Sequence, residues 1–293
     1  MTRTFGTLTA PGVFESVFPA HDVLPLVFES PHSGTGLPGD FDTRLGAEDL
    51  AWTADSHVEQ LFAAAPETGA TLIAALFARA YVDVNRAPDD IDAGMLAEPW
   101  PAPLRPTTKT GNGYGLIWRY CRGAGSPIYD RPLTVAEVQA RIGRYWRPYH
   151  DHLADTLASL YRRFGLVWHV SCHSMKSMGD DTAPGGARPR PDITLGDRHG
   201  RSCDGEVVSM LQGAFRERGY GVTVNDPFSG AYLVDAHGHP GQGRHSVQIE
   251  INRALYMDEE TRRPHQGFER VRNDVAAIIA LMADHVRTRL GLA

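Results

Sequence analysis

Residues 166–172 read LVWHVSC, a mostly apolar run that follows Gly165 and stops directly before His173. A run of this length and composition is typical of a strand buried inside a sheet. Residues 24–29 (LPLVFE) form a second such run, which the Pro and Gly of the following SPHSG bring to an end. A third run, residues 246–252 (SVQIEIN), alternates apolar and polar residues as a strand does. Each of the three expected strands therefore has, at or near its end, a polar side chain that could take part in catalysis or metal binding.

Patterns typical of helices separate these strands. Apolar residues at helical spacing, closed by Pro66, predict a helix over residues 47–65. Thr134 and Glu137 form a capping-box pair, which predicts the start of a long helix that runs to about Phe164. The remaining expected elements are strands over residues 70–77, 80–84 and 221–225, and helices over residues 202–218 and about 265–290.

Strands that alternate with helices predict a three-layer α/β/α sandwich with a mixed, mostly parallel sheet. We expect one domain over residues 1–293, with long loops rich in Pro and Gly at about residues 87–132 and 180–201. Whether these loops act as lids stays open at this point. In open α/β sheets, ligands bind outside the carboxyl ends of the strands. The residues able to do chemistry are therefore expected to meet at one edge of the sheet.

The overall composition argues against several classes of function. With 29 Lys and Arg against 35 Asp and Glu, the net charge is -6, whereas a nucleic-acid-binding surface would need a basic excess. No run of 18 apolar residues could cross a membrane, and residues 1–23 lack a secretory signal pattern, so the cytoplasm is the expected compartment. The three cysteines form no CxxC pair. The oligomeric state stays open.

Two histidines and a carboxylate are candidate metal ligands. His32 and His173 each follow an apolar strand beside small residues, a placement that suits imidazole ligation of zinc. A catalytic zinc normally has three protein ligands, and Asp55 is the third candidate, although an aspartate there could also cap a helix. His169 lies inside the apolar run and is expected to be a core residue. On spacing alone, four other residues could replace Asp55: Glu29, Asp49, His57 and Glu59.

Glu250 is a carboxylate within the otherwise apolar run VQIEIN. Buried glutamates are rare unless they are paired or functional. Burial would raise the pKa of Glu250 and make it a suitable general base for a zinc-bound water. A structural salt bridge with Arg253 or Arg244 is the alternative interpretation.

Several cationic side chains could bind substrate. Asn85 and Arg86 follow an expected strand, and such a pair can bind a carboxylate through the guanidinium and the amide. Arg79 could polarise a scissile carbonyl group. Further positive charge near the expected base comes from two residues, Arg244 and Arg253. A small dianionic substrate would need at least two such contacts, because each desolvated carboxylate left unpaired is costly.

Taken together, these motifs resemble the N-formylglutamate amidohydrolase family. The resemblance rests on SPHSG, TADSHVEQL, R-x-YVDVNR, CHSM and GRHSVQIEINRALYMDE, which occur in the family's order over about residues 24–259. More distantly, the arrangement is similar to zinc carboxypeptidases, aspartoacylases and zinc-dependent muramoyl amidases. That analogy implies the phosphorylase/hydrolase-like version of the α/β/α sandwich.

The resemblance implies one catalytic ion, zinc or in its place another divalent metal, held by His32, Asp55 and His173, with Glu250 as the base. It also implies cleavage of N-formyl-L-glutamate to L-glutamate and formate, as part of histidine degradation. One departure is that the compact HxxE ligand pair of carboxypeptidases is absent, since the third residue after His32 is Thr35. Asp55 is therefore the preferred third ligand.

Three alternatives to this function are open on the sequence. The same zinc chemistry could act on another N-acyl amino acid or on a peptidoglycan amide. A different enzyme class would use Cys172 or Ser33 as a nucleophile with a histidine base. A non-catalytic, metal-stabilised binding protein is the third alternative, although such a protein has no use for a buried base.

Overall fold

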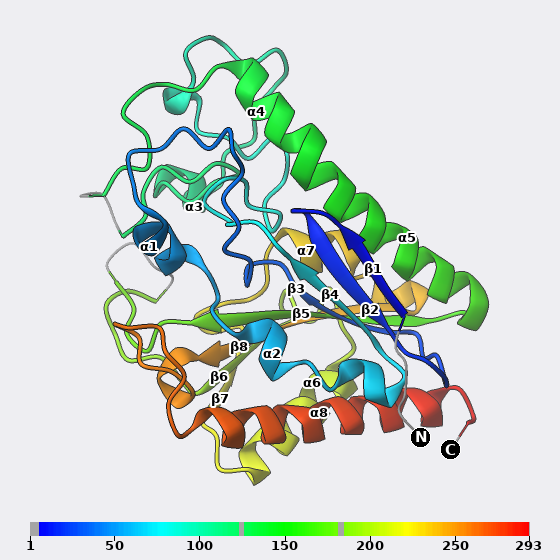
Figure 1. The fold of residues 1–293 in the computed structure, drawn as a ribbon. Coiled ribbons are helices and arrows are strands. Elements are labelled where there is room, and N and C mark those ends of the chain that lie inside the picture. The colour runs from blue at the N-terminus through cyan, green and yellow to red at the C-terminus, as the bar shows by residue number, and fades with distance from the viewer. Residues whose placement is uncertain (1–5, 123–125, 181–184, 293) are drawn as a thin grey trace.

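The computed structural model describes residues 6–122, 126–180 and 185–292 of the chain. Its centre is a sheet of eight strands in the order β1-β2-β4-β3-β5-β8-β6-β7 (Figure 1). Neighbours among β4, β3, β5 and β8 are parallel, whereas the β1–β2 hairpin and the β2–β4 and β6–β8 pairs are antiparallel. The sheet is thus mixed with a parallel centre, as predicted. Its strands are β1 Gly6–Ala10, β2 Phe14–Phe18, β3 Leu26–Ser30, β4 Thr71–Ala75, β5 Val167–Met175, β6 Ile193–Gly196, β7 Val222–Val224 and β8 Arg244–Asn252.

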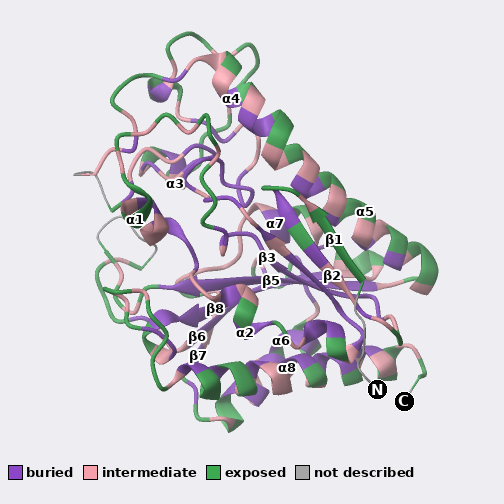
Figure 2. Cartoon of the chain, viewed as in Figure 1, coloured by how far each residue is buried: buried purple, intermediate pink, exposed green. Residues whose placement is uncertain are grey.

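Helices cover both faces of the sheet and confirm the three-layer arrangement (Figure 1). Helices α2, α6 and α8 pack on one face, and α5 and α7 pack on the other. Burial colours show the same layers, because the central strands are buried throughout while the outer helix faces are exposed (Figure 2). The α-helices are α1 Ala47–Leu50, α2 Val58–Leu61, α3 Thr108–Gly111, α4 Val135–Arg141, α5 Arg147–Phe164, α6 Gly205–Glu217, α7 Tyr232–His237 and α8 Phe268–Arg289.

The two faces of β5 differ in chemistry. Successive side chains of a strand point to opposite faces. Trp168 and Cys172 belong to the apolar core under α6 and α8. His169 and His173 point to the other face, toward α5 and α7, and both are buried. Burial of His169 confirms the prediction that it is a core residue. The strand continues to Met175, so His173 lies within β5 and not after it as predicted.

The helix predicted over residues 47–65 is broken, and the break lies at Asp55. Helix α1 and a 3-10 turn (Ala51–Thr53) end before Asp55, and α2 begins only at Val58. The backbone N–H of Asp55 donates to the carbonyl of His32 at 2.9 Å instead of continuing the helix. His57 has a left-handed backbone with φ of 67°. The apolar residues of this segment are buried, but the hydrogen bond from Asp55 to the His32 carbonyl interrupts the helix at its middle.

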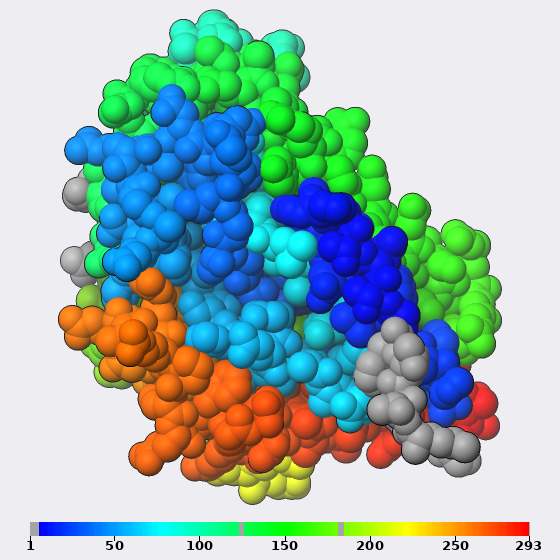
Figure 3. Space-filling model, in the orientation of Figure 1, coloured from blue at the N-terminus to red at the C-terminus, as the bar shows by residue number. Residues whose placement is uncertain are grey.

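Contacts from the segment before α8 hold this break in place. The hydroxyl of Tyr256 donates to the carbonyl of Ser56 at 3.0 Å, and Nε2 of His57 lies 2.9 Å from the carbonyl of Arg262. In the space-filling view, the light-blue segment around α1 and α2 lies directly against the orange segment that precedes α8 (Figure 3). The position of Asp55 thus depends on residues about 200 positions away in the chain.

Other predictions need correction. Residues 80–84 form turns and not a strand, because Asp83 N–H bonds to the carbonyl of Leu116 in the long loop and the segment never joins the sheet. The predicted loop of residues 180–201 contains β6, which pairs with β8; residues 181–184 of this loop lie outside the described residues. The hairpin β1–β2 and helix α7 were not predicted.

The long helical segment begins as predicted. Thr134 Oγ1 accepts from Glu137 N–H, and the Glu137 carboxylate accepts from Thr134 N–H, which completes the capping box. Helix α4 continues into α5 through a π-helical turn, Ile142–Trp146, just before Pro148. Proline has no N–H to donate, so the regular hydrogen bonding of an α-helix is interrupted at this point. Gly165 ends α5 in the left-handed conformation.

The described part of the loop at residues 87–132 is packed against the body of the protein. Leu50, Ala80, Cys121 and Ile128 form a small apolar cluster beneath it. The loop therefore forms a fixed wall over the carboxyl ends of the strands. Among the described residues, no helix is long and apolar enough to cross a membrane.

Candidate active site

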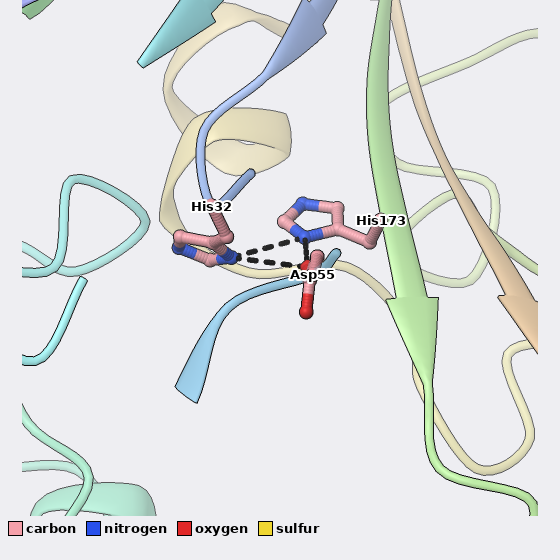
Figure 4. Close-up of side chains that lie close together, drawn as sticks. All are labelled: His32, Asp55 and His173. Carbon is pink, nitrogen blue, oxygen red and sulfur yellow. Dashed lines mark hydrogen bonds and ion pairs between the residues drawn. The ribbon is translucent and has the colours of Figure 1, made fainter. Parts of the chain in front are cut away.

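Two histidines and one aspartate converge at the carboxyl ends of β3 and β5 (Figure 4). The Nδ1 atoms of His32 and His173 lie 3.1 Å apart. Oδ2 of Asp55 lies 3.1 Å from Nδ1 of His173 and 3.5 Å from Nδ1 of His32. Ligand atoms on a tetrahedral zinc at bond lengths of about 2.05 Å stand roughly 3.3 Å apart. The three atoms therefore have the spacing expected of ligands to one ion.

The hydrogen bonds behind the histidines fix which nitrogen faces the centre. Nε2 of His32 donates to Oδ1 of Asp83 at 2.7 Å, because an ionised carboxylate can only accept. The hydroxyl of Ser171 donates to Glu29 at 3.0 Å and is left to accept from Nε2 of His173 at 2.9 Å. In a neutral imidazole the other nitrogen then carries a lone pair. Both Nδ1 lone pairs thus point toward Asp55, and an arrangement of three electron-pair donors fits a cation between them.

Asp55 is oriented so that one oxygen faces the histidines. Its Oδ1 accepts from Nη2 of Arg253 at 2.8 Å and lies 3.7 Å from Nη1 of Arg79, which leaves Oδ2 for the centre. Burial alone would raise the pKa of Asp55. The neighbouring imidazoles of His173 and His32 and the charge of Arg79 instead hold this pKa well below its usual range. Asp55 is therefore an ionised carboxylate, as a metal ligand must be.

The four alternative third ligands have other environments. Asp49 is half exposed and pairs with an arginine at the surface, and Glu59 accepts from the amide of the neighbouring residue. His57 contacts a backbone carbonyl. Glu29 is fully buried behind His173, where it accepts from Tyr149 and from Ser171. Of the five acids and histidines considered from spacing, the structure brings only Asp55 to the two imidazoles.

Glu250 lies beside this group on the neighbouring strand. It is paired in register with His173 of β5, so the two side chains stand next to each other on the same face. Its Oε1 accepts from Nε2 of Gln248 at 2.9 Å. Burial raises the pKa of Glu250, with the charge of Asp55 acting in the same direction and that of His173 against it. Neither arginine expected to form a salt bridge does so among the described residues, because Arg253 pairs with Asp55.

A cavity of about 780 Å³ opens onto this group. Four residues proposed from the sequence as catalytic or substrate-binding line it: Arg79, Asn85, Arg86 and Arg253. Arg79 donates to Oδ2 of Asp83 and stacks 4.6 Å from the Trp118 ring centre. Arg86 donates only to the backbone carbonyls of Tyr114 and Asn85 in the described contacts. The guanidinium of Arg86 therefore keeps N–H groups for an anionic ligand.

The structure does not bring Arg244 to this site. Arg244 is the first residue of β8, six positions before Glu250, and a strand rises about 3.3 Å per residue, so the two lie roughly 20 Å apart. Its guanidinium stacks 4.0 Å from the ring centre of Tyr161 at the other edge of the sheet. The prediction that Arg244 contributes charge near the base is therefore wrong, because closeness in the sequence means distance along an extended strand.

Sequence reasoning also missed residues that belong to the site. Asp83 lies inside the quoted VDVNR run, and its position between Arg79 and His32 could not be read from that run. Lys109 lines the cavity from the long loop, where no periodic pattern marks it. The only available signal was that the chain has two lysines, Lys109 and Lys176, among its 29 basic residues.

The fold and site together define an α/β/α hydrolase, in which polar groups at the carboxyl ends of parallel strands face one large cavity. The sequence model of the N-formylglutamate amidohydrolase family matches residues 24–257. The chain belongs to the N-formylglutamate amidohydrolase family and is an amide-hydrolysing enzyme.

Individual relatives agree with this assignment. The chain is 32% identical over 241 residues to an N-formylglutamate deformylase of Pseudomonas aeruginosa, with 81% of this chain and 84% of that protein covered. It is 30% identical to the N-formylglutamate deformylase of Pseudomonas putida, over 80% of this chain and 83% of that protein. The crystal structure of N-formylglutamate amidohydrolase from Ralstonia eutropha JMP134 superposes with a TM-score of 0.89 at 45% identity, covering 94% of this chain and 99% of that one.

Proposed function

We propose that this chain is a zinc-dependent N-formylglutamate deformylase, which cleaves N-formyl-L-glutamate to L-glutamate and formate. The observation that carries the proposal is the convergence of His32 Nδ1, Asp55 Oδ2 and His173 Nδ1 within 3.5 Å of one another. The names of the relatives from Pseudomonas and Ralstonia support the substrate. As the family resemblance implies, we place the reaction in histidine degradation. Because all eight described strands join one sheet, we also propose that residues 1–293 form one catalytic domain.

In this proposal His32, Asp55 and His173 hold the metal ion. A zinc ion in such a site supplies Lewis acidity and lowers the pKa of a water molecule from about 15.7 to about 7. Asp83 and Ser171 keep the imidazoles turned with Nδ1 toward the ion, and Arg253 keeps Asp55 Oδ2 there. Zinc is the metal these donor types favour in a three-ligand site.

Glu250 is the proposed general base. Its carboxylate takes a proton from the water as the water oxygen forms a bond with the formyl carbon. The proton then passes to the amide nitrogen, the carbon–nitrogen bond breaks, and the products are formate and the free amine of glutamate. Burial raises the pKa of this carboxyl, which suits a group that must accept and return one proton. Arg79, which lines the cavity beside Asp55, is the proposed partner of the oxyanion that forms on the formyl oxygen.

The proposed role of Asn85 and Arg86 is to bind a substrate carboxylate. Nδ2 of Asn85 lies 3.3 Å from Nε2 of His173, so this pair borders the metal group. Its Oδ1 accepts from the N–H of Leu233 in α7, which leaves the amide N–H groups for ligand. Arg253, proposed from the sequence as a substrate ligand, is better placed to orient Asp55, to which it donates at 2.8 Å.

The assay for this function is formate release from N-formyl-L-glutamate by the purified chain. We expect turnover that falls to background after dialysis against a chelator and returns on addition of about one equivalent of zinc, because Glu250 alone does not supply the Lewis acid that would lower the pKa of the water. N-acetyl-L-glutamate and a peptidoglycan amide serve as alternative substrates. Full activity in the chelated, metal-free protein would contradict the zinc mechanism. Turnover confined to another N-acyl substrate would contradict the proposal that N-formyl-L-glutamate is the substrate.

A thiol mechanism has no support in the geometry. Burial raises the pKa of the Cys172 thiol well above its usual range, and the side chain lies in the apolar core under α6 and α8. His173 points to the opposite face of the sheet. The thiol therefore has neither a base nor access to the cavity.

A further inference from the structure

The cations that line the cavity divide into two kinds according to their partners. Arg79 and Arg253 are each paired with a carboxylate of the metal group, Arg79 with Asp83 and Arg253 with Asp55. Arg86 donates only to backbone carbonyls. Lys109 has no carboxylate partner and no hydrogen bond from its ammonium among the described residues. Arg86 and Lys109 thus line the cavity without an ion-pair partner among the described residues, as does the exposed Lys176.

Lys109 is held in place by its surroundings. It lies in the short helix α3, whose neighbouring Thr110 and Thr107 side chains bond to the buried carboxylate of Asp90. The carbonyl of Lys109 accepts from Tyr114 N–H at 2.8 Å. The backbone is thus held on both sides of Lys109, and its side chain lines the cavity, where Nζ lies 5.4 Å from the centre of the Phe228 ring.

A second cation lies against the same ring. The guanidinium of Arg190 is 5.2 Å from the Phe228 centre, and Phe228, Arg190 and Lys109 all line the cavity. The charge of Glu250 acts on both cations, which places this cluster within electrostatic reach of the proposed base. Lys109 is partly buried, and an ammonium that is partly removed from water without an anionic partner is unfavourable unless a ligand supplies the charge.

We propose that Lys109, with Arg190 beside Phe228, binds the side-chain carboxylate of the substrate and so selects acidic N-acyl amino acids. The proposal rests on the function proposed above. Asn85 borders His173, next to the reacting amide, and with the adjacent Arg86 it suits the α-carboxylate, which is attached one carbon from the amide nitrogen. The side-chain carboxylate lies farther along the substrate, where the long loop brings Lys109 over the cavity.

The test compares two substrates that differ in one group, N-formyl-L-glutamate and its neutral isostere N-formyl-L-glutamine. In Lys109→Met we expect KM for N-formylglutamate to rise about 10- to 100-fold with little change in kcat, because one charge-assisted contact is lost. KM for N-formylglutamine should change less than about threefold, so the preference for the acidic substrate collapses. Lys109→Arg, which keeps the charge, should retain most of that preference. Lys176→Met, the chain's other lysine and an exposed cavity-lining residue, is the matched control.

The possible outcomes separate this proposal from the general function. If the wild-type enzyme releases formate from neither substrate, the deformylase function itself fails. If the wild type is active and Lys109→Met loses activity on both substrates equally, or on neither, the proposed role of Lys109 in selectivity is wrong while the deformylase function stands. Unchanged zinc content and thermal unfolding of the variant show that a loss does not come from misfolding.

The same residue predicts a pH dependence. Burial lowers the pKa of Lys109 to about 8; repulsion from Arg86 and Arg79 acts in the same direction, and Glu250 and Asp83 oppose it. Deprotonation above this pH removes the positive charge, so at pH 9 about one tenth of the lysine would stay charged. KM for N-formylglutamate should therefore rise up to about tenfold between pH 7 and 9 in the wild type. It should rise much less in Lys109→Arg, and an equal rise in both proteins would contradict the assignment.

Discussion

Replacement of Glu250 by glutamine should lower kcat for formate release by about 10²–10⁴-fold while the protein keeps its zinc. The substitution preserves the shape of the side chain and removes only its ability to take a proton. Among the described contacts, no hydrogen bond or ion pair joins Glu250 to the three proposed ligands, so the metal group should be unaffected. The measurements are kcat by a formate assay and zinc per chain by atomic emission.

The control for this prediction is Glu217→Gln, a glutamate exposed at the end of α6, which should keep full activity. Activity within a factor of about three of wild type in Glu250→Gln would remove the general base from the mechanism. Loss of zinc along with activity would instead assign Glu250 to the metal site, and the proposed division between ligands and base would then be wrong.

Replacement of Asp55 by asparagine should abolish tight zinc binding and, with it, activity. The amide has nearly the same shape but carries no charge, and it leaves Arg253 and Arg79 facing an uncharged group. Changes in the residues around a metal ligand cost about 10–100-fold in affinity, and loss of a charged ligand should cost at least as much. Zinc affinity is measured by competition with a chromogenic chelator, independently of turnover.

Thermal unfolding gives a second measure of the same change. A ligand present at about 1,000 times its Kd stabilises the folded state by about 4 kcal/mol, so zinc should raise the melting temperature of the wild type and not that of Asp55→Asn. The matched control is Asp49→Asn, a rival ligand on sequence spacing whose side chain is 49% exposed. Zinc binding lost in Asp49→Asn and retained in Asp55→Asn would overturn the assignment of the third ligand.

Much of the fold could be predicted from short windows of sequence. The strands at residues 24–29, 166–172 and 246–252 appear as β3, β5 and β8, and the capping box at Thr134 starts the expected helix. These features depend on the period of apolar residues and on hydrogen bonds between near neighbours. The placement of polar residues at the strand ends then indicated His32, His173 and Glu250, because parallel strands bring their carboxyl ends to one edge.

The sequence did not determine how distant segments meet. It did not reveal the break at residues 54–57, because the bond from Asp55 N–H to the His32 carbonyl crosses between two segments that are joined only in the folded chain. The strand β6 was hidden in a loop-like composition, since its pairing with β8 supplies the stability that its own four residues lack.

By itself, then, the sequence determined the layers, the parallel centre of the sheet and the family to which the chain belongs. Only the tertiary structure decided which carboxylate joins the two imidazoles. It also decided which cations are paired with a carboxylate and which face the cavity without one. The physical reason is that helix and strand patterns are set by local periodicity, whereas ion pairs act over a few ångströms of space. Arg244 is near Glu250 in the sequence, but its guanidinium stacks on Tyr161. Lys109 is 141 residues from Glu250 in the sequence, yet the charge of Glu250 affects its pKa.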